Sequence, residues 1–76
     1  MILPTKHIPT AHSLLGVAAL VLSSLERPRT LTALWDRLRA EPRVGTFGRL
    51  ILALDLLYTV GAVDYDGGLL RRTVAR

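Results

Sequence analysis

The chain of 76 residues contains no cysteine, which excludes disulfide bonds and thiolate metal sites as ways of stabilising a small fold. Its two histidines, His7 and His12, have no carboxylate near them in the sequence, so we expect no structural zinc site. A chain this short buries only about 60% of the surface that its unfolded form exposes, so its core is marginal. Oligomerisation or a protein partner is the remaining source of stability.

Motifs of catalysis and of cofactor binding are also missing. The turn at residues 66–68 lacks the spacing of a phosphate-binding loop, and Ser13, Ser23 and Ser24 lie on one predicted helix without a paired base. A few short elements rarely enclose a ligand on several sides. We therefore expect a protein that is not an enzyme and that uses no metal or cofactor.

Long apolar runs are absent as well. The longest, over residues 14–22, is interrupted only by Gly16 and is far shorter than the ~20 residues of a membrane span. Residues 50–63 carry Asp55 in their middle. The first ten residues contain two prolines and one lysine, and no small-residue cleavage site follows at the right place. These features predict a cytoplasmic protein that makes no membrane contact.

Lysine is scarce: of the ten basic residues, Lys6 is the one lysine and the other nine are arginines. The formal net charge of +4 permits contact with nucleic acid or with an acidic partner, but the arginines are scattered along the chain. Apolar residues, in contrast, are abundant at 50%. So small a chain cannot hide all of them in one copy, and exposed apolar patches usually mark a protein interface.

The sequence predicts a single domain over residues 1–76 in three parts. Residues 1–10 form an extended arm, because Pro4 and Pro9 each push the preceding residue out of the helical region. Residues 11–61 hold three helices, with Thr30 and Thr46 as N-caps of the second and third. Residues 62–76 form a wing hairpin and a C-terminal tail. The predicted helices cover residues 11–26, 31–40 and 47–60.

Local signals support these elements. In the second helix, Leu31, Leu34, Trp35 and Leu38 recur at helical spacing and predict one buried stripe that includes the tryptophan. Gly61 stands where a helix end favours a left-handed residue. The Asp-Gly-Gly turn at residues 66–68 lies between two strand-like runs and predicts a hairpin.

Three helices followed by a hairpin is the chain order of a winged helix-turn-helix domain, a mostly helical α+β fold. The N-terminal arm could add a third strand to the wing. In this fold the third helix lies in the major groove of DNA, where its outward side chains read bases and phosphates.

The third helix lacks the donors that such a role needs. Its outward strip presents Gly48, Asp55 and Thr59, flanked by Leu52, Leu56 and Arg49. Only Arg49 is suited to contact phosphate, and the carboxylate repels it. The strip therefore favours protein contact, with help from the first helix and from the arm added to a partner's sheet. The candidate protein-interface residues are Ile2, Leu3, Ile8, Gly16, Leu20, Leu52, Asp55 and Leu56.

A second interpretation stays open, in which the chain is a small DNA-binding regulator of the repressor or antitoxin type. The candidate DNA contacts are Arg43, Thr46 and Arg49 at the start of the third helix, and Arg71 and Arg72 on the hairpin. Because adjacent strand residues point to opposite faces, only one of the two hairpin arginines can lie on a given surface. Weak, non-specific DNA contact inside a larger assembly and a homodimer also remain open.

Several short stretches resemble a family of very small bacterial proteins, the middle components, sixth type, of ABC three-component systems. These stretches are residues 2–9, 13–16, 27–30, 34–35, 52–58, 61–62 and 68–71. The resemblance implies a role in a bacterial conflict or antiphage operon, where the middle component links an ABC ATPase related to SMC and Rad50 proteins to an effector subunit. The layout is also similar to the kite-type winged-helix subunits of SMC complexes, which are mainly dimeric scaffolds. The resemblance carries no active-site residue onto this chain.

Overall fold

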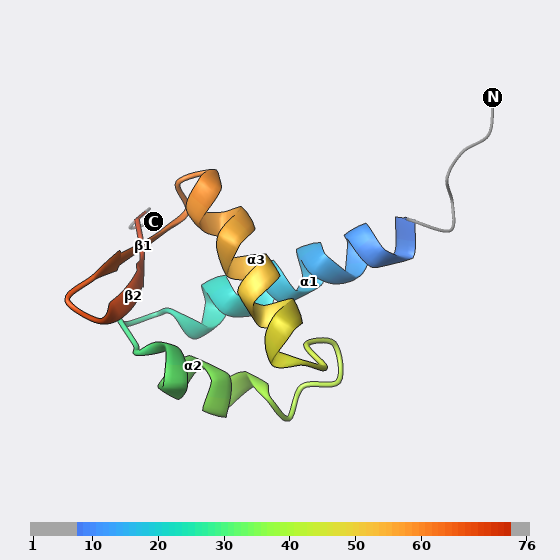
Figure 1. Cartoon of the computed structure of the whole chain (residues 1–76), viewed down its shortest axis with the longest axis horizontal. Coiled ribbons are helices and arrows are strands. Elements are labelled where there is room, and N and C mark those ends of the chain that lie inside the picture. The colour runs from blue at the N-terminus through green and yellow to red at the C-terminus, as the bar shows by residue number, and fades with distance from the viewer. Residues whose placement is uncertain (1–7, 74–76) are drawn as a thin grey trace.

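Three helices and a two-stranded antiparallel hairpin form the structure, a computed structural model that describes the backbone of residues 8–73 and the side chains of residues 14–73 (Figure 1). The elements are α1 (Ile8–Ser24), α2 (Leu31–Leu38), α3 (Phe47–Thr59), β1 (Val63–Asp66) and β2 (Leu69–Arg72). Their order confirms the predicted mostly helical α+β fold with a winged-helix-like layout.

The first helix begins earlier than predicted. It starts at Ile8 instead of Ala11, so residues 8–10 belong to the helix and not to an extended arm. Pro9 does not prevent this, because a helix tolerates proline in its first turn, where the missing N–H has no intrahelical partner. Residues 1–7 lie outside the described part of the chain, and with them the candidate contacts Ile2 and Leu3.

Both predicted N-caps are confirmed. The Thr30 hydroxyl accepts a hydrogen bond from the Ala33 N–H at 3.1 Å, and the Thr46 hydroxyl accepts one from the Arg49 N–H at 3.2 Å. Each bond satisfies a backbone donor that the first turn of a helix leaves unpaired. Gly61 follows α3 with a φ of 82°, the left-handed conformation predicted for it.

The hairpin closes through a two-residue turn. Asp66 pairs with Leu69, and Gly67 and Gly68 between them have φ values of 59° and 81°. Positive φ at both positions matches the twist of the strands and explains the two glycines.

The α1–α2 connector also pairs with the hairpin, through an isolated β-bridge at Arg29. Arg29 and Leu70 exchange backbone hydrogen bonds of 3.0 and 2.7 Å, which occupy the outer edge of β2. The third strand predicted from the N-terminal arm falls on residues 1–7, which lie outside the described part of the chain.

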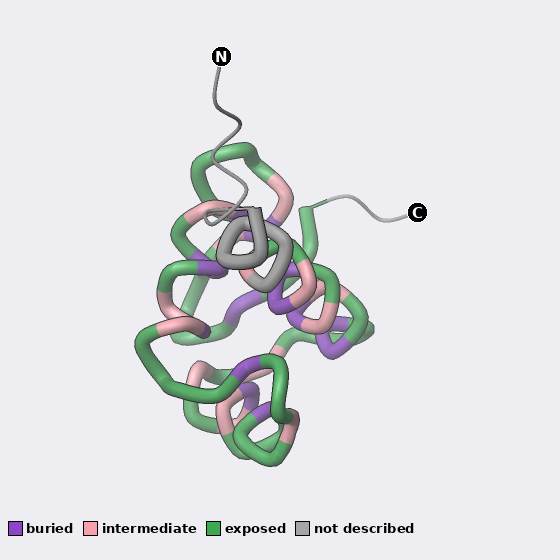
Figure 2. Tube along the Cα trace, turned by 90° about the vertical axis from the view of Figure 1, so that its right-hand side faces the viewer, coloured by how far each residue is buried: buried purple, intermediate pink, exposed green. Residues whose placement is uncertain are grey.

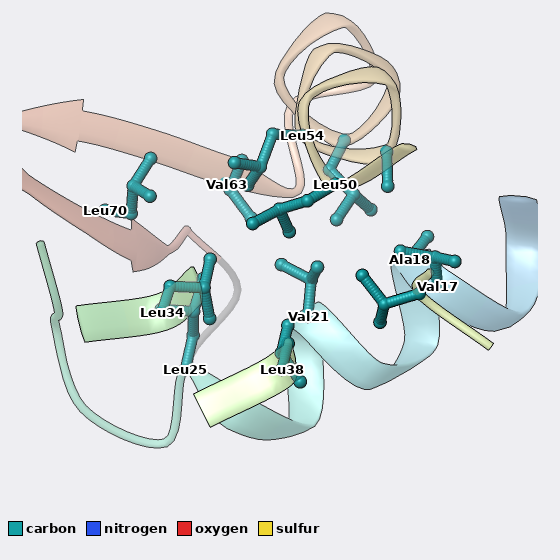
Figure 3. Packing of buried hydrophobic residues seen from close by; sticks show 13 residues of the cluster. Val17, Ala18, Val21, Leu25, Leu34, Leu38, Leu50, Leu54, Val63 and Leu70 are labelled. Carbon is teal, nitrogen blue, oxygen red and sulfur yellow. The ribbon is translucent and has the colours of Figure 1, made fainter. Parts of the chain in front are cut away.

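One hydrophobic cluster holds the elements together. Leu50 and Leu54 point from α3 toward α1, while Leu34 of α2 and Leu70 of β2 close the other side (Figure 3). Val44, in the α2–α3 loop, is fully buried too, so this loop is part of the core. Each helix alternates between buried and exposed positions (Figure 2), as expected of amphipathic helices that pack on one side.

Trp35 lies at the edge of this cluster and is half-buried, not a fully enclosed core residue. Its ring packs edge-on against Phe47, with centroids 5.4 Å apart and an interplanar angle of 81°. The Arg39 guanidinium lies 6.0 Å from the indole centroid. The tryptophan thus joins α2 to the start of α3.

The N-terminal half of α1 projects past α3, while the other elements gather around its C-terminal half (Figure 1). Among the described side chains of α1, the fully enclosed apolar ones begin at Val17. Before Val17, the described Leu14 is half-buried and packs against the edge of the cluster.

Candidate docking face on the third helix

The outward side of α3 presents apolar side chains to solvent. Gly48, Leu52, Asp55 and Thr59 are exposed and Leu56 is half-buried, so the predicted outward strip is the one observed. We call these five residues the α3 face. Leu52, at the centre of this face, is 57% exposed. Burying a leucine side chain is favourable, so a partner that covers Leu52 would gain free energy.

Two large side chains of the last turn of α3 extend this apolar surface. Tyr58 is 62% exposed and Val60, the C-cap, is 66% exposed. The sequence placed both on the apolar side of the helix. The hairpin leaves the C-terminal turn of α3 uncovered, and a helical wheel carries no information about where the following strands go.

On the described part of the first helix the exposed large apolar side chain is Leu15, whereas the candidate contact Leu20 is less exposed. Leu15 is 60% exposed, whereas Leu20 is half-buried and packs against the core. Gly16 is half-buried, and a Cβ added there would lie 3.9 Å from Cδ of Arg43, an ordinary contact. A neighbouring backbone therefore does not explain this glycine. Ile8 is the first residue of α1, and its side chain lies outside the described part.

Asp55 is the charged group at the centre of the α3 face. Among residues 14–73, no ion pair joins its carboxylate to a cation. The exposed carboxylate stands between apolar neighbours in a chain of net charge +4.

Two of the three candidate DNA contacts at the start of α3 hold the α2–α3 loop together. Arg49 Nε donates to the Val44 carbonyl at 2.8 Å, and its Nη2 donates to the Arg43 carbonyl at 3.0 Å. The Thr46 hydroxyl is engaged as the helix cap. Arg43 is exposed, with its aliphatic part over Gly16 of α1. Arg49 and Thr46 are thus committed to local structure.

The hairpin arginines differ in their surroundings. Arg71 lies 3.5 Å from Asp64 and 3.8 Å from Asp66, so two carboxylates offset its charge. Arg72 is exposed and stands opposite Val63 across the hairpin. Among the candidate DNA contacts, Arg43 and Arg72 are the two exposed side chains for which the structure shows neither an ion pair nor a role in capping a helix or bonding the loop.

Arg29 has a structural role that the sequence analysis missed. Its Nε donates to the Ser24 carbonyl at the end of α1 at 2.7 Å, and its Nη2 lies 3.6 Å from the Glu26 carboxylate. The backbone N–H of Glu26, and then the charges of nearby arginines, hold the pKa of Glu26 below its ordinary value of 4.5. An arginine placed just after a helix end is the sequence signal for such a cap.

No group of three or more metal-ligating side chains occurs in the part of the chain that the structure describes. In the same part, no helix combines the length and the hydropathy that crossing a membrane requires.

The comparisons with known proteins identify the family of this chain. No curated protein and no solved structure matches the chain significantly. A family model described as ABC-three component (ABC-3C) system Middle Component 6 matches residues 3–73, which include every helix and strand. This match confirms the family that the sequence resembles, and it spans far more than half of the 76 residues. The chain belongs to the middle component 6 family of ABC three-component systems.

Proposed function

We propose that this chain is a non-enzymatic adaptor of its ABC three-component system, working in the bacterial cytoplasm. It links an ABC ATPase related to SMC and Rad50 proteins to an effector subunit, in an operon that defends against phage. Both contacts are protein–protein contacts, and the α3 face supplies one of them.

The observation that carries this proposal is the exposed leucine on the helix that reads DNA in other winged helices. Leu52 is 57% exposed, and Tyr58 and Val60 are exposed at the C-terminal end of the same helix. A partner that covers these side chains removes their apolar area from water, at about 25 cal/mol per Å². The family membership supports the same conclusion, because a middle component acts with the other components of its system.

The DNA-binding alternative has less support in the same geometry. A groove-reading helix exposes arginine, lysine or amide side chains, whereas the charged residues of α3 are Arg49, held by loop carbonyls, and Asp55. A phosphate backbone placed on the α3 face would meet Asp55 and two leucines. Weak contact through Arg43 or Arg72 remains compatible with an adaptor.

Co-purification of the chain with the ATPase and effector components of its system tests the proposal. We expect the wild-type chain to retain at least one companion subunit, and Leu52→Ser to reduce that retention about tenfold or more, because a central apolar contact is lost. Tyr65→Ser is the matched control, since Tyr65 is 59% exposed but lies on the hairpin. This control is expected to behave as wild type.

A wild-type chain that elutes as a monomer beside its companion subunits would contradict the adaptor role. Retention on duplex DNA without those subunits, with steep loss as salt rises, would establish the regulator instead. Equal behaviour of Leu52→Ser and Tyr65→Ser in an intact complex would show that another surface makes the contact.

A further inference from the structure

The α3 face has the geometry of one half of a helix–helix contact. Leu52, Asp55, Leu56 and Thr59 follow at intervals of three, one and three residues, so they form a ridge along one side of the helix. Gly48 continues the ridge by one turn toward the N-terminus, where the missing side chain allows close approach. From Gly48 to Thr59 the ridge is about 16 Å long, which suits about three turns of a partner helix.

Asp55 decides what this partner helix must carry. Its carboxylate has no ion-pair partner among residues 14–73, and its neighbours on the ridge are Leu52 and Leu56. Covering the face with apolar groups alone would bury an unpaired charge, which is costly. A cation on the partner, placed opposite Asp55, removes this cost and fixes the register of the two helices.

A second copy of this chain does not meet that requirement. A two-fold contact uses the same patch on both subunits, so both Asp55 carboxylates would enter one interface. The second charged residue of α3, Arg49, already donates to the Val44 and Arg43 carbonyls of its own α2–α3 loop, so it is not available as the partner of a second Asp55. Each copy also carries a net charge of +4, so the two copies repel each other over a longer range.

We propose that the α3 face receives an amphipathic helix of a companion subunit, with a lysine or arginine at the centre of its apolar stripe that pairs with Asp55. This inference rests on the adaptor function and specifies the chemistry of the partner at that site. The leucines on either side of Asp55 shield the ion pair from water and so strengthen it.

The test measures the affinity of the companion subunit that co-purifies with the wild-type chain, at low and at high salt. We expect Asp55→Lys to weaken binding about thirtyfold or more, because it sets two cations against each other. Asp55→Asn is expected to weaken it about fivefold to tenfold, with a smaller difference at high salt. Asp36→Lys and Asp36→Asn make the same changes at an exposed aspartate of α2, and both are expected to bind within about twofold of wild type.

The outcomes separate this inference from the adaptor function. If Leu52→Ser weakens binding but Asp55→Lys and Asp55→Asn bind as the Asp36 variants do, the adaptor function stands and the pairing with a cation is wrong. If Asp55→Asn bound the companion subunit more tightly than wild type, the pairing of Asp55 with a cation would also be wrong. A wild-type chain that binds no companion subunit refutes the adaptor function itself, and a homodimer that buries Leu52 overturns the choice of partner. Circular dichroism confirms that each variant remains folded.

Discussion

Leu50→Ala is expected to lower the free energy of unfolding by about 2–5 kcal/mol, the range for deleting a large side chain from a packed core. Leu50 is fully buried, points from α3 toward α1, and belongs to the cluster that joins all elements (Figure 3). A chain of this length has a total stability of about 4–11 kcal/mol. At the lower end of that range the loss leaves a substantial unfolded fraction at 37 °C.

The control for this variant lies two positions along the same helix. Leu52→Ala removes the same atoms from a side chain that is 57% exposed, so the expected loss is below about 0.5 kcal/mol. Urea unfolding followed by circular dichroism measures both variants. Similar losses for the two would mean that Leu52 is also enclosed in the free chain, which contradicts the α3 face as a free surface.

Arg49→Ala is expected to destabilise the fold by about 1.5–3 kcal/mol, because hydrogen bonds from a charged donor are stronger than neutral ones. The change removes the bonds to the Val44 and Arg43 carbonyls, which fix the loop that carries the buried Val44 side chain. Arg49→Lys is expected to recover only part of the loss, since an ammonium cannot reproduce the guanidinium fork.

Arg72→Ala serves as the matched control, because Arg72 is an exposed arginine on β2. Its expected effect on the unfolding free energy lies within about 0.5 kcal/mol. The regulator interpretation instead requires that Arg49→Ala and Arg72→Ala reduce the DNA binding of the folded protein. Thermal and urea unfolding, together with the DNA retention of the folded variants, distinguish a structural role of Arg49 from a role in DNA binding.

The elements could be predicted because their signals are local. Thr30 and Thr46 cap helices through their own first turns, and the glycines at residues 67–68 impose a turn by their backbone freedom. The start of α1 was misjudged because the restriction on the residue before a proline is a preference and not a prohibition, and Ile8 before Pro9 is helical.

The candidate site was predicted only in part, because the exposure of a side chain depends on which elements pack against it in the folded chain. Periodicity placed Leu52 and Asp55 on the outside of α3, and the structure agrees. The same periodicity chose Leu20 over Leu15, since it cannot say which neighbours an almost uniformly apolar helix touches. The structural roles of Arg29 and Arg49 depend on carbonyls five or six residues away, whose directions follow from the folded loops.

The central claim, that α3 docks onto protein instead of DNA, is tested most directly by placing a photo-crosslinking phenylalanine analogue at Tyr58. The experiment irradiates the complex with companion subunits and duplex DNA both present, and uses the same analogue at Tyr65 as control. Both positions are similarly exposed, at 62% and 59%. The account predicts a crosslink from position 58 to a companion subunit and none from position 65. A crosslink from position 58 to DNA, or none at all in an intact complex, would contradict it.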